Sequence, residues 1–192
     1  MKIINEKQVD LTKVDSAMFY SISSLHKGLK NVDLGHILIS RATEYLQINP
    51  QIKNFCTLSP IPNFRNYLKR RSNQDESIKG LLNINDLENI EENKDKLTSL
   101  CLRYLFVEKK KNNKAMDPVC NFHLKNGASI YRLNWSGDTS SQRINESYGL
   151  MVNYLYLTSA KSSNSINYKQ NGVITHQKPI DQLATHLNIT IK

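Results

Sequence analysis

The sequence predicts a domain of the α+β class, an α/β sandwich in which helices flank a mixed β-sheet. Short apolar runs rich in β-branched and aromatic residues indicate strands, and apolar residues at helical spacing indicate helices. Of the 192 residues, 39% are hydrophobic and 22% are charged, which is the balance of a globular protein. We find no internal repeat or low-complexity linker, so residues 1–192 are predicted to form one domain.

The first elements are a polar lead-in, a strand and a glycine-containing loop. Residues 1–15 are polar and predicted to be loosely ordered, whereas Ser16 to Ser23 has the composition of a strand. A basic loop follows from His26 to Asp33, and it contains Gly28 and lysines on both sides of that glycine.

A helix is predicted directly after this loop. Leu34, Ile37, Leu38 and Leu46 recur at helical spacing, and Asp33 is a suitable N-cap. A strand, a glycine loop and a helix form a phosphate-binding arrangement, because the first helical turn has unpaired N–H groups and a dipole that favours anions. Many purely structural connections also contain Gly and Lys, so both interpretations stay open.

A second strand is predicted from Phe55 to Leu58, and it ends at Ser59. Pro60 disfavours helical geometry at the preceding residue, so Ser59 lies between a strand and a turn. Phe64 to Arg71 is predicted to form a short basic helix. From the residues alone, Ser59 is equally well explained as an ordinary turn serine.

Residues 72–96 are rich in Asn, Asp and Glu, and they are predicted to be a solvated polar insertion with one or two marginal helical turns. An amphipathic helix follows, with apolar residues between Leu97 and Leu105. Its lysine-rich end at residues 109–111 suits the negative pole of the helix dipole.

The next helix carries the most informative histidine of the chain. Asp117 is a suitable N-cap, Pro118 fits the first turn, and Gly127 can end the helix, so His123 lies on a short, well-delimited element. A structural histidine that bonds its own helix end is the alternative interpretation. A strand is predicted directly after this helix.

The C-terminal elements alternate between strand, loop and helix. The strand after the His123 helix spans Ala128 to Trp135, and a polar loop covers Ser136 to Ser147. Tyr148 to Leu157 is an apolar run that we interpret as a further strand, and a helix is predicted near Ile180 to Leu187.

Charge and cysteine usage exclude several classes of protein. The net charge of +9 would suit nucleic acid, but the basic residues are scattered and no basic patch interleaved with aromatics supports that function. A polyanionic small molecule would use the same positive field. Cys56, Cys101 and Cys120 are odd in number and widely spaced, which favours buried thiols in a reducing compartment, and no metal-ligand spacing is present. No apolar run is long enough to span a membrane, and the N-terminus is unlike a secretory signal.

Five segments together resemble the catalytic domain of malonyl-CoA decarboxylase. The resemblance runs in order from about Ala17 to the C-terminus, and its segments are Phe19–Ser23, Lys27–Gly35, Phe55–Phe64, Asp117–Trp135 and Gly149–Tyr154. It implies an acetyltransferase-like (GNAT-type) sheet whose pyrophosphate loop is the glycine loop described above. It covers only the later part of the family's catalytic domain, so we expect the opening strands and the helical domain of the family to be missing. A truncated product, an incomplete gene model and a divergent minimal form are all consistent with this expectation.

The resemblance implies the site residues and the reaction. Ser59 and His123 are the implied catalytic pair, with His123 as the proton donor and Ser59 as a hydrogen-bonding group to the malonyl moiety. The implied substrate-binding residues are Ser21, Lys30, Asn31, Val32, Asp33, Leu34, Gly35, His36, Ser59 and Tyr154. Tyr154 is also explained as an aromatic of the core.

Two loop positions depart from the family. Asp33 replaces the usual glutamate and Asn31 replaces a glycine, so the orientation of the substrate is in question. Asp33 also has an ordinary structural explanation as the cap of the following helix.

The implied reaction converts malonyl-CoA to acetyl-CoA and carbon dioxide through a thioester enolate, and it places the protein in fatty-acid metabolism. No organic cofactor and no metal are expected, because coenzyme A is part of the substrate and the thioester is the electron sink. Three other functions stay open: a Ser-His hydrolase, a coenzyme A-dependent acetyltransferase, and a non-catalytic remnant that binds acyl-CoA.

The implied location is intracellular: cytoplasmic, mitochondrial or peroxisomal. No targeting signal is visible, and the chain ends in Ile-Thr-Ile-Lys192 rather than the peroxisomal Ser-Lys-Leu. No nucleic acid partner is expected, and a homo-oligomer is left open.

Overall fold

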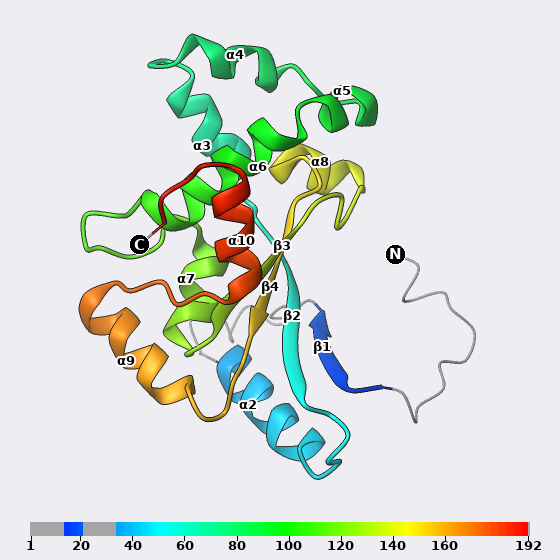
Figure 1. The fold of residues 1–192 in the computed structure, drawn as a ribbon, viewed down its shortest axis with the longest axis vertical. Helices are drawn as coiled ribbons and strands as arrows, with labels where there is room; N and C mark the ends of the chain where they lie inside the picture. Colours follow the sequence, from blue (N-terminus) through cyan, green and yellow to red (C-terminus); the bar gives the residue numbers. More distant parts are fainter. Residues whose placement is uncertain (1–13, 21–33, 192) are drawn as a thin grey trace.

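A four-stranded mixed sheet organises the computed structural model, which describes residues 14–20 and 34–191 (Figure 1). The strands are β1 (Ser16–Tyr20), β2 (Asn54–Pro60), β3 (Ser129–Asn134) and β4 (Met151–Leu155), in the order β1-β2-β4-β3. β1 runs parallel to β2, whereas β4 runs antiparallel to both β2 and β3. This arrangement confirms the predicted α+β class with a mixed sheet. The acetyltransferase-like relationship of the sheet stays a prediction.

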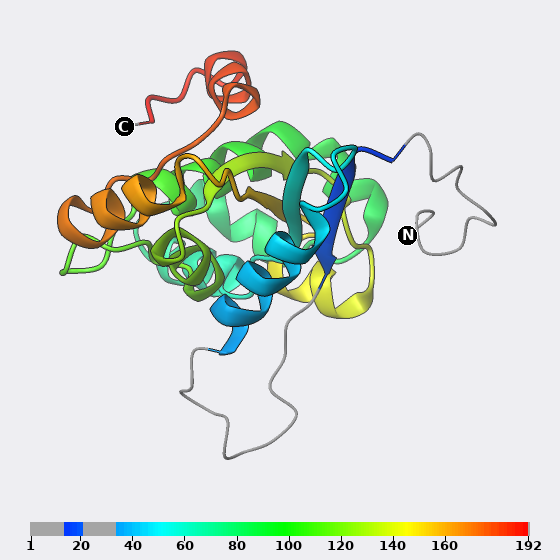
Figure 2. The ribbon, with the colours of Figure 1, turned by 90° about the horizontal axis from the view of Figure 1, so that it is seen from below.

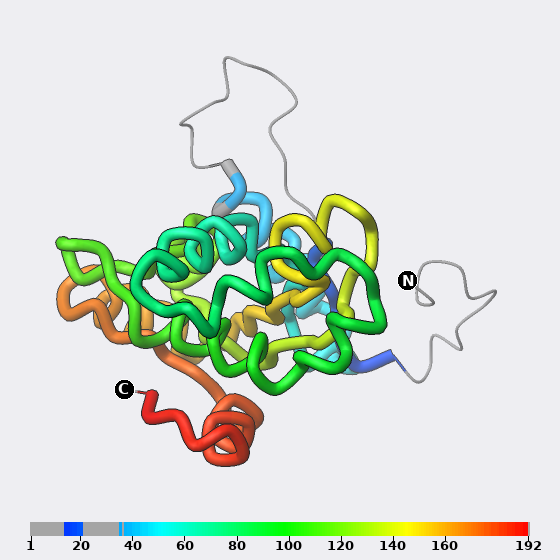
Figure 3. The backbone as a smooth tube through the Cα atoms, turned by 90° about the horizontal axis from the view of Figure 1, so that it is seen from above, coloured from blue at the N-terminus to red at the C-terminus, as the bar shows by residue number. Residues whose placement is uncertain are grey.

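The helices gather at both ends of the sheet. They are α2 (Leu34–Leu46), α3 (Phe64–Arg71), α4 (Glu76–Leu82), α5 (Leu87–Glu92), α6 (Lys94–Leu102), α7 (Pro118–Lys125), α8 (Ser141–Ser147), α9 (Lys161–Asn171) and α10 (Lys178–His186), and α6 continues into a π-helical turn, η3 (Arg103–Val107). Figure 1 shows α3 to α6 and α8 at one end of the sheet and α2 and α9 at the other. In Figures 2 and 3, α2 and α10 lie on opposite sides of the sheet.

The burial of the strands follows their place in the sheet. Every residue of the inner strand β4 is buried, which explains its nearly continuous apolar sequence. The edge strand β1 instead alternates, with Ala17 and Phe19 half-buried and Met18 and Tyr20 exposed. The strand predicted from Tyr148 is shorter in the structure, because Tyr148 ends α8 in a left-handed conformation.

The helix that carries His123 is built as its sequence predicts. The Asp117 carboxylate is buried and accepts hydrogen bonds from the backbone N–H groups of Val119 and Cys120. Pro118 occupies the first helical position, and Gly127 lies beyond the helix with a φ of 82°. A Cβ atom at Gly127 would lie 2.0 Å from the Lys161 carbonyl oxygen, so the close approach of α9 requires glycine here.

Most of residues 72–96 are exposed, but α4 and α5 anchor this segment in the core, which the sequence did not predict. Ile78, Leu81 and Ile90 are at most 2% exposed. The guanidinium of Arg65 holds the connection between the two helices by donating to the carbonyl oxygens of Leu82 and Ile84. Leu81 follows Ile78 by three positions and precedes Ile90 by nine. The spacing of these apolar residues within a polar sequence therefore did indicate burial in the core.

Two further helices were not predicted. α8 lies within residues 136–147, which were expected to be a loop, and α9 follows β4. Ser140 caps α8 by accepting from the backbone N–H of Arg143. The sequence of α9 is rich in Ser and Asn, which have weak helix propensity, so its stability comes from contacts such as the buried Tyr168.

The three cysteines are buried and have free thiols, as the sequence predicts. Across the described ranges, the structure contains no helix with the length and apolar character needed to cross a membrane.

Candidate active site

Ser59 and His123 meet between the sheet and α7. Ser59 lies near the end of β2, and its Oγ is 3.1 Å from Nε2 of His123. The two residues are only 6% and 5% exposed, respectively. The structure thus brings together the two side chains that the sequence singled out, although they are 64 positions apart. Their catalytic roles stay predictions.

Tyr156 and Thr57 extend this pair into a chain of four polar side chains. The Tyr156 hydroxyl lies 2.8 Å from Nδ1 of His123, on the opposite side of the ring from Ser59. The Ser59 hydroxyl donates to Oγ1 of Thr57 at 2.8 Å. The sequence interpretation missed both residues. The signal was a two-residue spacing in each segment. It places Thr57 and Ser59 on one face of β2, and it places Tyr156 on the same side as Tyr154 just past the end of β4.

The directions in this chain of hydrogen bonds depend on the tautomer of His123. With the Ser59 hydroxyl donating to Thr57, we assign Ser59 Oγ as the acceptor from His123 and the imidazole proton to Nε2. Nδ1 then accepts from the hydroxyl of Tyr156, which is the stronger donor of that pair because a phenol is more acidic than a neutral imidazole. His123 therefore presents an N–H group to Ser59 while Tyr156 fixes the tautomer and the orientation of the ring.

Burial keeps His123 neutral. It lowers the pKa of the imidazole to about 3, because the charged form loses its hydration. At neutral pH the side chain is thus a neutral hydrogen-bond donor rather than a cation.

Tyr154 supports His123 from one face. The two rings stack with centroids 4.3 Å apart and an interplanar angle of 22°, and Tyr154 is fully buried. Burial raises the pKa of the Tyr154 phenol well above its ordinary value. In this structure Tyr154 contacts the imidazole, which agrees with the core interpretation. Its contact with substrate stays a prediction.

The strand β2 is adapted at Thr57 to hold these groups. The Thr57 carbonyl oxygen accepts from Nδ2 of Asn153 at 2.6 Å, and Thr57 Oγ1 accepts from the backbone N–H of Tyr154 at 3.2 Å. Side-chain bonds thus link β2 to β4 at this position. They fix Thr57 and so fix the acceptor of the Ser59 hydroxyl.

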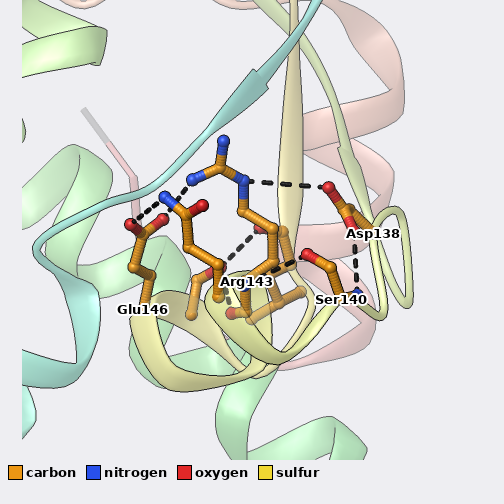
Figure 4. A network of polar contacts seen from close by, with 7 residues as sticks. Asp138, Ser140, Arg143 and Glu146 are labelled. Carbon is orange, nitrogen blue, oxygen red and sulfur yellow. Dashed lines mark hydrogen bonds and ion pairs between the residues drawn. The ribbon is translucent and has the colours of Figure 1, made fainter.

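A polar network around α8 fixes the segment that leads into β4 (Figure 4). The Arg143 guanidinium lies 3.8 Å from an oxygen of Asp138 and also pairs with Glu146 in the last turn of the helix. The backbone N–H of Gly149 donates to the carbonyl oxygen of Arg143, which closes the end of α8. The network belongs to the scaffold rather than to the Ser59–His123 pair.

Half of the ten predicted substrate-binding residues are not described by the structure. Ser21, Lys30, Asn31, Val32 and Asp33 fall outside the described residues.

Leu34, Gly35 and His36 form the first turn of α2, so the predicted helix after the glycine loop is confirmed from Leu34 onward. Within residues 14–20 and 34–191, no three His, Cys, Asp or Glu side chains gather as the ligands of a metal ion would.

Comparison with known proteins identifies the relatives of this chain. The family model described as the malonyl-CoA decarboxylase C-terminal domain matches residues 2–191. The mitochondrial malonyl-CoA decarboxylase of Anser anser anser is 39% identical over 191 aligned residues, which cover 83% of this chain and 38% of that protein. The Rattus norvegicus protein of the same name is 36% identical, covering 81% of this chain and 38% of that protein.

Solved structures agree with this relationship. The crystal structure of malonyl-CoA decarboxylase from Agrobacterium vitis has a TM-score of 0.84 and 31% identity, and the match covers 92% of this chain and 47% of that chain. The corresponding structure from Rhodopseudomonas palustris has a TM-score of 0.78 and 29% identity, with 94% and 44% covered. This chain thus spans about two fifths of the length of the curated relatives and less than half of the solved chains.

The fold and the buried pair define an α+β domain in which a neutral histidine and a serine form a polar centre beside an apolar sheet. The family match gives this class a specific identity: the chain belongs to the malonyl-CoA decarboxylase C-terminal domain family.

Proposed function

We propose that this protein decarboxylates malonyl-CoA to acetyl-CoA and carbon dioxide at the Ser59–His123 pair. The observation that carries the proposal is the 3.1 Å contact between Ser59 Oγ and His123 Nε2, in a chain that belongs to the malonyl-CoA decarboxylase family. The curated relatives that have this enzyme's name are longer than this chain.

The substrate determines what the site must supply. Breaking the bond between C2 and the carboxylate releases carbon dioxide and leaves the electron pair in an enolate shared by C2 and the thioester oxygen. Each well-placed donor to that oxygen contributes about 3 kcal/mol of transition-state stabilisation. Ser59 is proposed to turn its hydroxyl from Thr57 to the malonyl group when substrate binds, and thereby to orient the bond that breaks. The thioester acts as the electron sink, so the proposal needs no further cofactor.

Protonation of C2 is assigned to His123 as a neutral donor. An enolate carbon is a stronger base than an imidazolate, so it can take the proton from Nε2 of a neutral imidazole. Tyr156 can pass its hydroxyl proton to Nδ1 in the same movement, because it already lies 2.8 Å from that atom. The ring then stays neutral, and the starting tautomer is restored when a solvent proton reaches Nε2 and Nδ1 returns its proton to the Tyr156 phenolate. This route accounts for a histidine whose pKa is lowered to about 3.

The anchoring of coenzyme A is assigned to the segment that ends in the first turn of α2. The support is the family membership together with the strand β1 and helix α2 that flank the glycine loop. Unpaired N–H groups at the start of a helix of this length attract a pyrophosphate.

A mitochondrial location is proposed on the names of the curated relatives. Malonyl-CoA is the proposed partner, and an oligomer of identical chains remains a further proposal. Fractionation of cells that express a tagged form of the full gene product would test the location, and a purely cytosolic distribution would contradict it.

Replacing His123 by Gln is the sharpest test of the site. The variant is expected to lose at least about 10²-fold in turnover of malonyl-CoA while its affinity for coenzyme A changes little. His186→Gln is the matched control, because His186 is an exposed histidine at the end of α10. Loss of coenzyme A binding in step with turnover would contradict the catalytic assignment of His123.

A further inference from the structure

Lys161 occupies a position that its charge does not favour. It is the first residue of α9, where the positive end of the helix dipole disfavours a cation. Its Nζ nevertheless donates to Oγ of Ser40 in α2 at 2.6 Å, and the contact is partly buried. A second bond joins the same two regions, from Nε2 of Gln47 to Oγ1 of Thr158 at 2.6 Å. The connection between β4 and α9 is thus fixed to α2 at two points, one near the middle of the helix and one just past its end.

The first turns of α9 also hold the end of α7. The Lys161 carbonyl oxygen lies against Gly127, where it leaves no room for a Cβ atom. Nδ2 of Asn164 donates to the Gly127 carbonyl oxygen at 3.3 Å, and Oγ of Ser165 donates to the Lys125 carbonyl oxygen at 2.6 Å. Lys125 and Gly127 lie two and four positions after His123. A displacement of α9 would therefore also displace the end of the helix that carries the imidazole.

We propose that Lys161 is a positioning residue, which fixes the distance between the start of α2 and the Ser59–His123 pair. The inference rests on the proposed function, because it takes the start of α2 as the anchor of coenzyme A. Lys161 contacts α2 through its side chain and Gly127, just after α7, through its backbone, so one residue connects α2 to the end of the helix that carries His123. Misplacing a substrate by about 1 Å can cost about 10²-fold in rate, so such a connection has a functional consequence.

Three variants test the proposal. Lys161→Met keeps the apolar stem and removes the donor, Ser40→Ala removes the acceptor at a helical position that favours alanine, and Lys169→Met changes an exposed lysine on the same helix as the control. Hydrogen exchange of the amides of α2 and α7 and the steady-state constants for malonyl-CoA are measured in each. The double variant of Lys161 and Ser40 completes a double-mutant cycle.

Lys161→Met and Ser40→Ala are each expected to speed exchange in α2 by about tenfold and to raise KM by about tenfold, with kcat changed less. The double variant is expected to match the single ones, and Lys169→Met to match the unsubstituted protein. Unchanged exchange in α2, faster exchange spread evenly over the protein, or equal effects on kcat and KM would each overturn the proposal. If the unsubstituted protein shows no turnover, the proposed function fails, and the exchange in α2 alone decides whether Lys161 holds that helix.

Discussion

His123 has a hydrogen-bond partner at each ring nitrogen and a tyrosine ring against one face. Ser59 and Tyr156 occupy the nitrogens, and Tyr154 stacks on the imidazole. None of these partners carries a negative charge that would stabilise an imidazolium, and burial lowers the pKa to about 3. The site is therefore built around a neutral histidine whose proton we assign to Nε2.

The neutral state of His123 has a consequence for stability against pH. In the unfolded chain the pKa is near 6.5, so between pH 3 and 6.5 the unfolded state binds the extra proton and folding becomes less favourable as the pH falls. The contribution of His123 to the free energy of unfolding is expected to rise by on the order of 3 kcal/mol from pH 4 to pH 7 and to level off above pH 7. Urea unfolding at a series of pH values measures it.

His123→Gln isolates the contribution of His123, because every other titrating group is retained. The variant is expected to lose that part of the pH dependence, whereas the exposed His186→Gln control keeps it. Identical pH profiles for His123→Gln and the unsubstituted protein would mean that folding does not shift the pKa of His123, which would contradict burial of a neutral imidazole.

Removing the hydroxyl of Tyr156 tests the direction of the hydrogen-bond chain. Tyr156→Phe leaves Nδ1 of His123 buried without its donor, which costs about 1–3 kcal/mol, and it breaks the proposed supply of a proton. Turnover is expected to fall by about 10- to 100-fold with a small change in KM. Tyr131→Phe, at an exposed tyrosine of β3, is the control. Full activity in Tyr156→Phe would remove this residue from the mechanism.

At the scale of the elements, α7 was predictable and α9 was not. Asp117, Pro118 and Gly127 are local signals, and each performs in the structure the task that its residue type indicates. By contrast, α9 is held by contacts with distant segments, such as the Tyr168 hydroxyl that accepts from the backbone N–H of Ala115 and donates to Asn121. Local composition cannot reveal such bonds, because the partners lie 53 and 47 positions away.

The contact between α7 and α9 gives a prediction at this scale. Gly127→Ala places a Cβ atom 2.0 Å from the Lys161 carbonyl oxygen at a φ of 82°, so the variant is expected to lose about 2–4 kcal/mol of stability. Gly80→Ala is the matched control, because the added methyl group meets nothing within 4 Å inside α4 and is expected to stabilise the protein by about 1 kcal/mol. Equal unfolding midpoints for the two variants in urea would contradict the proposed packing of α7 against α9.

At the scale of the whole molecule, the sequence predicted the class and the central pair but not the chain of four side chains. Ser59 and His123 lie in segments with recognisable motifs, whereas Tyr156 and Thr57 acquire their place only when β2 pairs with β4. The anchoring of residues 72–96 in the core was missed for a related reason. Asp75 and Asp86 are N-caps whose signal was visible in the sequence, but the burial of Ile78 and Ile90 depends on the rest of the fold.

The central claim concerns the chain as a whole, which spans about two fifths of its curated relatives. The most direct measurement is the conversion of malonyl-CoA to acetyl-CoA by the purified protein, followed against the spontaneous rate and against Ser59→Ala. We expect turnover well above the spontaneous rate, and we expect Ser59→Ala to reduce it by about 10²-fold or more. A folded protein that binds coenzyme A but does not accelerate the decarboxylation of malonyl-CoA would contradict the proposed activity.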